Sequence, residues 1–294
     1  MDQETTPPTR KPSVKRIFIG LGVAIVLIAV IGSAAANLYI VSAIFGEDFS
    51  EYDLGYEDDS SYAACNVSGI TLWGDLVGRQ TGSTDEDGNS EVDQTTSDSI
   101  LFYIDEAEGD QAIKAILIEI DSYGGYPVAA EEVMNALKRA EKPTVALIRE
   151  YGDSAAYWAA TGADKIFASE NSEVGSIGVT MSYIDYSKQN TVEGITYNQI
   201  SSGKFKDAGN WEKTLTAEEK ALFQRDVNIL HDNFVRSVAE NRNLDIEKAR
   251  LLADGSTMLG AMAKEKGLID EIGGIYEVEE YLKGLIGEEP EICW

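Results

Sequence analysis

The feature that most constrains this 294-residue chain is an apolar run near its N-terminus. Residues 17–45 carry no charged side chain, and about 20 apolar residues are enough for a helix to cross the hydrocarbon core of a bilayer. Basic residues precede the run and acidic residues follow it, so the positive-inside rule predicts a cytoplasmic tail over residues 1–16 and an extracytoplasmic position beyond residue 45. The alternative is a cleaved signal peptide, with small residues for processing at 33–36. Both interpretations export the rest of the chain, and the length of the run favours a single-pass transmembrane anchor in the cell membrane.

Composition limits what the exported part can do. A formal net charge of −27 argues against nucleic acid as a partner, because neutralising phosphates requires clustered lysines and arginines. His231 is the one histidine, which leaves little room for a histidine-rich metal site. Cys65 and Cys293 lie too far apart in the chain for a zinc knuckle or a Cys-x-x-Cys redox pair. They could pair with each other, and the sequence leaves that question open.

We expect three parts beyond the anchor. Residues 46–65 are acidic and predict a stalk, residues 66–285 predict one domain, and residues 286–294 predict a short C-terminal tail. Within the domain, residues 80–98 are rich in serine, threonine, glycine and acids and have no apolar period, which is typical of a mobile loop.

Apolar runs of strand length alternate with segments of helical spacing in the domain, which predicts an α/β fold with largely parallel strands. The best-marked helix covers residues 216–241, where Thr216 and Glu219 match a capping box. Its expected inner face consists of Phe223, Val227, Leu230 and Phe234. The other expected elements are strands at 115–120, 144–148 and 165–168, a turn at 121–125, and helices at 129–140, 246–253 and 258–266, the last ending at Gly267.

A serine at a strand-to-helix turn is the first feature that points to chemistry. Ser154 follows the strand expected at 144–148, and backbone amides at such a turn can stabilise a developing oxyanion. Alternatively, Asp153 or Ser154 caps the helix that follows. Ala156 stands where a Gly-x-Ser-x-Gly elbow has its second glycine, which disfavours an α/β-hydrolase.

A nucleophilic serine needs a base, and this composition offers lysine more readily than histidine. We expect His231 to be a helix residue that borders the core. The loop at residues 201–209 carries Lys204 and Lys206, and a lysine can act as a base where burial favours its neutral amine. A serine paired with a lysine is therefore the simplest catalytic arrangement that the chain permits.

Taken together, these segments resemble the signal peptide peptidase A family of membrane-anchored Ser-Lys proteases. The resemblance covers about residues 66–274, which is most of the exported chain. Several motifs in the same order are far more specific than any one of them. The motifs are residues 117–125, Ser154-Ala155-Ala156-Tyr157, residues 161–169, Val174-Gly175-Ser176-Ile177-Gly178-Val179, residues 202–207 and residues 266–274.

The resemblance implies a role for each matched residue. Ser154 would be the nucleophile and Lys206 the neutral general base, with Lys204 as the runner-up. Ser176 would hold the catalytic amine through its hydroxyl. The oxyanion hole would consist of two backbone amides, those of Gly125 and Ala155.

The chain departs from the family pattern at two positions. Tyr123 stands where the family usually has proline, which leaves the local turn geometry open. Ala155 stands where glycine commonly follows the nucleophile, and it keeps the backbone N–H. The resemblance also implies a Clp-protease- or crotonase-like spiral of strand–strand–helix units. It further implies a membrane-mounted homo-oligomeric ring, in which neighbouring protomers contribute the serine and the lysine of each active site.

The implied activity is a peptidase without metal or cofactor that degrades residual signal peptides or other membrane-proximal peptides. We expect small or apolar side chains at the cleavage position. The related proteases that cleave stomatin-like membrane proteins share the Ser-Lys chemistry and are an alternative. A catalytically silent scaffold on the crotonase fold is another, and export away from coenzyme A disfavours a crotonase-like acyl-CoA enzyme.

Overall fold

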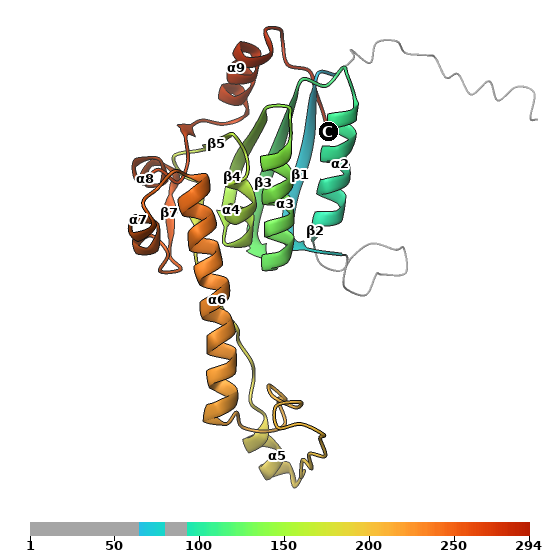
Figure 1. The fold of residues 1–294 in the computed structure, drawn as a ribbon, viewed down its shortest axis with the longest axis vertical. Coiled ribbons are helices and arrows are strands. Elements are labelled where there is room, and N and C mark those ends of the chain that lie inside the picture. The colour runs from blue at the N-terminus through green and yellow to red at the C-terminus, as the bar shows by residue number, and fades with distance from the viewer. Residues whose placement is uncertain (1–64, 80–92) are drawn as a thin grey trace, which may run out of the picture. The chain divides into compact units, whose positions relative to one another are not determined.

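The computed structural model describes residues 65–79 and 93–294, and the strands of this part form one sheet (Figure 1). Neighbouring strands are parallel in the order β2-β1-β3-β4-β5-β8. β9 pairs with the start of β1, β6 pairs with the end of β4, and β7 runs antiparallel to β6. The strands are β1 (Val67–Val77), β2 (Gln94–Thr96), β3 (Ala115–Gly125), β4 (Thr144–Asp153), β5 (Lys165–Ala168), β6 (Glu173–Gly175), β7 (Thr257–Leu259), β8 (Glu271–Ile272) and β9 (Ile292–Cys293).

Helices cover both faces of the sheet, which confirms the predicted mixed α/β fold. Ile116, Ile118 and Ile120 of β3 belong to the larger core with side chains of α2, α3 and α4, which lie along one face in Figure 1. Leu117 belongs to a smaller core with Val278 of α9. Because β3 is buried on both faces, its sequence from residue 115 to residue 118 is a continuous apolar run. The helices are α2 (Ser97–Gly109), α3 (Pro127–Arg139), α4 (Ala155–Ala160), α5 (Ser187–Glu193), α6 (Ala217–Asn241), α7 (Ile246–Leu251), α8 (Gly260–Lys266) and α9 (Ile275–Ile286).

The long helix α6 has the predicted start but only part of the predicted buried face. The Thr216 side chain accepts a hydrogen bond from the Glu219 N–H, and the Glu219 carboxylate accepts one from the Thr216 N–H, so the capping box is confirmed. Of the four expected inward residues, only Phe234 is fully buried. The N-terminal half of α6 extends away from the sheet in Figure 1, which leaves Phe223 and Val227 half-buried.

Several expected boundaries were wrong, and three of the differences have a clear cause. The turn expected at 121–125 is the end of β3, because these residues still pair with β1. The polar segment expected as a loop to residue 98 already contains β2 and the start of α2, where the Thr96 hydroxyl accepts the Ser99 N–H. Helix α8 begins at Gly260 rather than at residue 258, because residues 257–259 pair with β6.

The two ends of the described domain are joined. Cys65 and Cys293 form a disulfide with a Cα–Cα distance of 5.7 Å, which settles the pairing that the sequence left open. The Asn66 side chain reinforces this junction, since its amide donates to the Glu288 carboxylate and to the Glu289 carbonyl. The last residues of the chain are therefore fastened to the beginning of β1, at the amino end of that strand.

The predicted anchor, residues 17–45, and almost all of the predicted stalk lie outside the described residues. Among residues 65–79 and 93–294, no helix combines the length and the apolar character needed to cross a membrane.

Candidate active site

Ser154 lies at a sharp turn where β4 meets α4. Its backbone has φ of 50°, in a region that residues other than glycine adopt at a cost of about 1–3 kcal/mol. The turn is held by backbone hydrogen bonds, from the Ser154 N–H to the Gly175 carbonyl (2.8 Å) and from the Trp158 N–H to the Ser154 carbonyl (2.9 Å). Ser154 occupies the N-cap position of α4, yet its side chain makes no capping hydrogen bond. A side-chain capping role for Ser154 is therefore wrong.

Two consecutive glycines bring the end of β3 against this turn. A Cβ added to Gly124 would lie 2.9 Å from the Cβ of Ser154, and one added to Gly125 would lie 2.0 Å from the Leu76 carbonyl oxygen. The amides on either side of Gly125 are occupied, since the Gly124 N–H donates to the Ser122 hydroxyl and the Tyr126 N–H donates to the Leu76 carbonyl. Gly125 itself lines the cavity beside Ser154 and Ala155.

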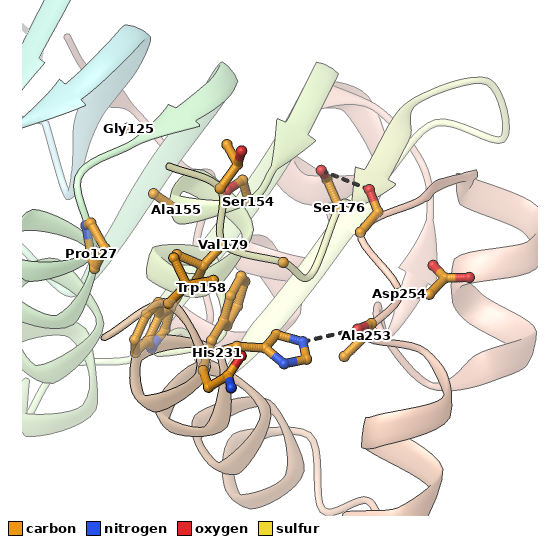
Figure 2. A pocket seen from close by; sticks show the side chains of 16 residues that line it. Gly125, Pro127, Ser154, Ala155, Trp158, Ser176, Val179, His231, Ala253 and Asp254 are labelled. Carbon is orange, nitrogen blue, oxygen red and sulfur yellow. Dashed lines mark hydrogen bonds between the residues drawn. The ribbon is translucent and has the colours of Figure 1, made fainter. Parts of the chain in front are cut away.

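Ser176 reaches the same cavity from the end of β6. It also has a positive φ, 48°, and its N–H donates to the Ser256 carbonyl at 3.0 Å. Its hydroxyl donates to the Gly255 carbonyl at 3.2 Å, as Figure 2 shows. Ser154, Ser176, Gly125 and Ala155 thus meet at one cavity, although they come from three separate parts of the sequence.

The cavity beside these residues has a volume of about 490 Å³ and a wall of mixed character, in which polar groups face apolar side chains such as Trp158 and Phe234. Trp158, labelled in Figure 2, forms part of this wall. It stacks on Phe234, which also lines the cavity, with ring centroids 4.6 Å apart. His231 of α6 is half-buried and also lines the cavity, with its Nε2 2.9 Å from the Ala253 carbonyl oxygen. The cavity can hold an apolar side chain next to the Ser154 hydroxyl.

Neither candidate lysine lines this cavity. Lys206 is exposed and belongs to residues 180–216, hereafter the arm, whose helix α5 lies beside the N-terminal end of α6 in Figure 1. The Lys204 ammonium forms an ion pair with Glu218 at 2.6 Å. Among the described residues, the Lys206 amine forms neither an ion pair nor a hydrogen bond. The single chain therefore assembles the nucleophile half of the predicted site and leaves Lys206 outside it.

Sequence reasoning missed an unusual carboxyl group next to Ser154. Asp153 is only 4% exposed, and its Oδ1 has no hydrogen-bond partner among the described residues. Burial, and to a lesser extent the charge of Glu173, raise the pKa of Asp153 to about 6. An aspartate in a polar turn gives no sequence signal of such burial, because its environment depends on neighbouring strands.

Comparison with known proteins identifies the family. The profile of peptidase family S49 matches residues 136–287. A candidate protease of Methanocaldococcus jannaschii is 31% identical over 284 residues, which cover 95% of this chain and 86% of that protein. This chain belongs to peptidase family S49. Membership confirms the predicted resemblance to the signal peptide peptidase A family and the predicted enzyme class, a serine protease.

Two further S49 relatives match smaller parts of their own length. A candidate signal peptide peptidase SppA of Enterococcus faecium is 32% identical over 65% of this chain and 56% of that protein. The chloroplast serine protease SPPA of Arabidopsis thaliana is 31% identical over 55% of this chain and 24% of that protein. Among solved structures, a ClpP1 variant of Listeria monocytogenes aligns with a TM-score of 0.44 and 14% identity, covering 70% of this chain and 91% of that one. The Clp-like spiral stays a prediction at this level of similarity.

Proposed function

We propose that this S49 protease is a membrane-anchored endopeptidase that uses a Ser154–Lys206 dyad. The observation that carries the proposal is the Ser154 turn, because this serine has φ of 50°, its hydroxyl makes no capping hydrogen bond, and it lies at a cavity beside two backbone amides. In the proposed reaction, the neutral Lys206 amine takes the Ser154 proton while Oγ attacks the scissile carbonyl carbon. The amides of Gly125 and Ala155 hold the resulting oxyanion.

The remaining steps return the enzyme to its starting state. Collapse of the tetrahedral intermediate breaks the C–N bond, and the Lys206 ammonium gives its proton to the leaving amine. Water then attacks the acyl-enzyme ester and transfers a proton to Lys206, and the carboxylic acid product leaves as Ser154 regains its proton. The Ser176 hydroxyl, now bonded to the Gly255 carbonyl, would orient the amine.

We place Lys206 in the active site of a neighbouring protomer. An amine acts as a base only when it is neutral, which requires exclusion of water, and the Lys206 side chain is exposed in the single chain. Exposed apolar side chains on the arm, among them Ile184, Val192, Ile200 and Trp211, support an oligomer in which the arm is covered. The ion pair of Lys204 with Glu218 favours Lys206 over Lys204 as the base.

The substrates that we propose are residual signal peptides and other membrane-proximal peptides. The apolar side chains in the cavity wall, among them Trp158, Val227 and Phe234, support an apolar side chain at the cleavage position. The Cys65–Cys293 disulfide supports an extracytoplasmic domain, because disulfides persist in oxidising compartments. The apolar run at residues 17–45 would hold the domain at the outer face of the membrane.

Mixing two inactive variants tests the shared site. The full-length chain in detergent is assayed on a fluorogenic peptide with an apolar residue at the cleavage position. Ser154→Ala and Lys206→Ala should each lose activity, and Lys204→Ala is the matched control that keeps it. Protomers of the two inactive variants, dissociated and reassembled together, should regain activity, because some sites then combine an intact Ser154 with an intact Lys206. An active Ser154→Ala variant would refute the assignment of Ser154 as the nucleophile, and no recovery on mixing would refute the shared site.

A further inference from the structure

A buried hydroxyl behind the two glycines has no role in the proposed reaction so far. Ser122 is 1% exposed and lies where the register of β3 shifts against both β1 and β4. Its Oγ donates to the Gly74 carbonyl at 2.6 Å and accepts the Gly124 N–H at 3.1 Å. One hydroxyl thus joins the irregular part of β1 to the backbone that leads into Gly125.

The hydrogen bond from Gly124 determines which amide remains available at the cavity. With the Gly124 N–H directed to Ser122 and the Tyr126 N–H directed to the Leu76 carbonyl, Gly125 carries the amide between two anchored neighbours. Gly124 also lies against the nucleophile, because a Cβ there would be 3.1 Å from the Ala155 nitrogen. A displacement of Gly124 therefore changes the spacing between Ser154 and both proposed oxyanion donors.

The turn needs such an anchor in this chain. Proline would restrict φ at position 123, where the family usually has it, but Tyr123 imposes no such restriction. The Tyr123 ring packs against the Tyr151 ring with centroids 4.1 Å apart and a tilt of 34°, and the Tyr151 N–H donates to the Asp121 carboxylate at 3.1 Å. These contacts hold the exposed side of the segment, while Ser122 holds its buried side.

We propose that Ser122 is a positioning residue of the oxyanion hole. Its hydroxyl fixes the Gly124–Gly125 backbone so that the Gly125 N–H points to the oxygen of the carbonyl that Ser154 attacks. This inference rests on the proposed function of Ser154. An oxyanion donor acts in the transition state, so loss of its position lowers kcat and leaves substrate binding nearly unchanged.

The test measures kcat and KM separately for Ser122→Ala in the full-length chain. We expect kcat to fall at least about tenfold with KM changed less than about twofold, since single oxyanion donors contribute about 100-fold or more. Binding of a peptide aldehyde, whose carbonyl carbon forms a tetrahedral adduct with the Ser154 oxygen, should weaken by a similar factor. Ser172→Ala is the matched control, because Ser172 is equally buried and bonds the Ser169 N–H and the Arg149 carbonyl away from the cavity.

Each result decides for or against the proposal. Parental kcat and aldehyde affinity in Ser122→Ala would overturn it, and so would an equal loss of kcat in Ser172→Ala. If Ser122→Ala does not assemble, Ser122→Cys takes its place, because a thiol keeps much of the volume but forms weaker hydrogen bonds. Ser154→Ala is measured in parallel. Activity in that variant would overturn the proposed function, whereas its inactivity beside a fully active Ser122→Ala would overturn only the role of Ser122.

Discussion

Replacing Asp153 with asparagine tests how a buried carboxyl next to Ser154 affects the stability of the fold. The pKa of Asp153 is about 6 in the folded chain against an ordinary value of 3.8, first because of burial and second because of the charge of Glu173. The folded chain therefore binds this proton more tightly than the unfolded chain does. The resulting stabilisation is complete below about pH 4 and is lost as the pH rises through about 6.

The pKa difference of Asp153 corresponds to about 3 kcal/mol, at roughly 1.4 kcal/mol for each pH unit. The Asp153→Asn variant is uncharged at every pH, so the ionisation cost that the parent incurs at neutral pH is absent. Its free energy of unfolding, relative to that of the parent, should rise by about 3 kcal/mol between about pH 4 and about pH 8. The pH dependence of this difference, rather than its value at one pH, isolates the carboxyl charge.

Urea denaturation of the full-length chain in detergent, at a fixed protomer concentration and across this pH range, measures the difference. Tryptophan fluorescence can report unfolding, because Trp158 is buried against Phe234. Asp185→Asn is a control, since hydrogen bonds from Ser187 lower the pKa of Asp185 below its ordinary value of 3.8; the stabilisation from its charge is lost only below about pH 4, so the difference between that variant and the parent should stay nearly constant across the range tested. A difference between Asp153→Asn and the parent that stays constant from about pH 4 to about pH 8 would refute the reasoning.

Three further variants test separate parts of the structure. Thr216→Ala removes the side-chain acceptor at the start of α6 and should lower the free energy of unfolding by about 1 kcal/mol in urea denaturation. Cys293→Ser removes the disulfide to Cys65 and should lower the free energy of unfolding by about 2–4 kcal/mol. Reduction of the parent should have the same effect, and a parent whose stability does not change with reductant would contradict this prediction. Gly124→Ala places a Cβ 2.9 Å from that of Ser154, so labelling of Ser154 by a phosphonate probe should be lost, and unchanged labelling would contradict the close approach.

The strands show how far hydropathy alone can predict this fold. β5 has the bounds that its short apolar run predicts, residues 165–168. β3 and β4 continue past their apolar runs, to Gly125 and Asp153, because backbone partners on neighbouring strands hold their polar ends. Ser122 pairs with Gly152 in this way. Such pairing joins segments distant in the sequence, so an apolar period cannot reveal it.

The site could be predicted only in part. Ser154 could be placed at a strand-to-helix turn from the local pattern, whereas Gly125 and Ser176 came from the family resemblance. The structure brings all three to one cavity. The contribution of His231 to the cavity wall had a weak signal, since it lies on α6 between Val227 and Phe234, which also line the cavity. The burial of Asp153 had none, because it depends on the neighbouring strands.

Ser154 and Lys206, the two residues of the proposed dyad, have different surroundings in the single chain. Ser154 stands at the end of a buried parallel strand, where one hydrogen bond to the Gly175 carbonyl and the close approach of Gly124 fix its backbone. Lys206 stands on an arm whose apolar side chains are exposed in the single chain, and its own amine meets solvent. Ser154 already has its cavity in the single chain, but the Lys206 amine can act as a base only where water is excluded. Assembly of protomers would therefore both cover the arm and create the general base, which links proteolysis to oligomerisation through the desolvation of one lysine.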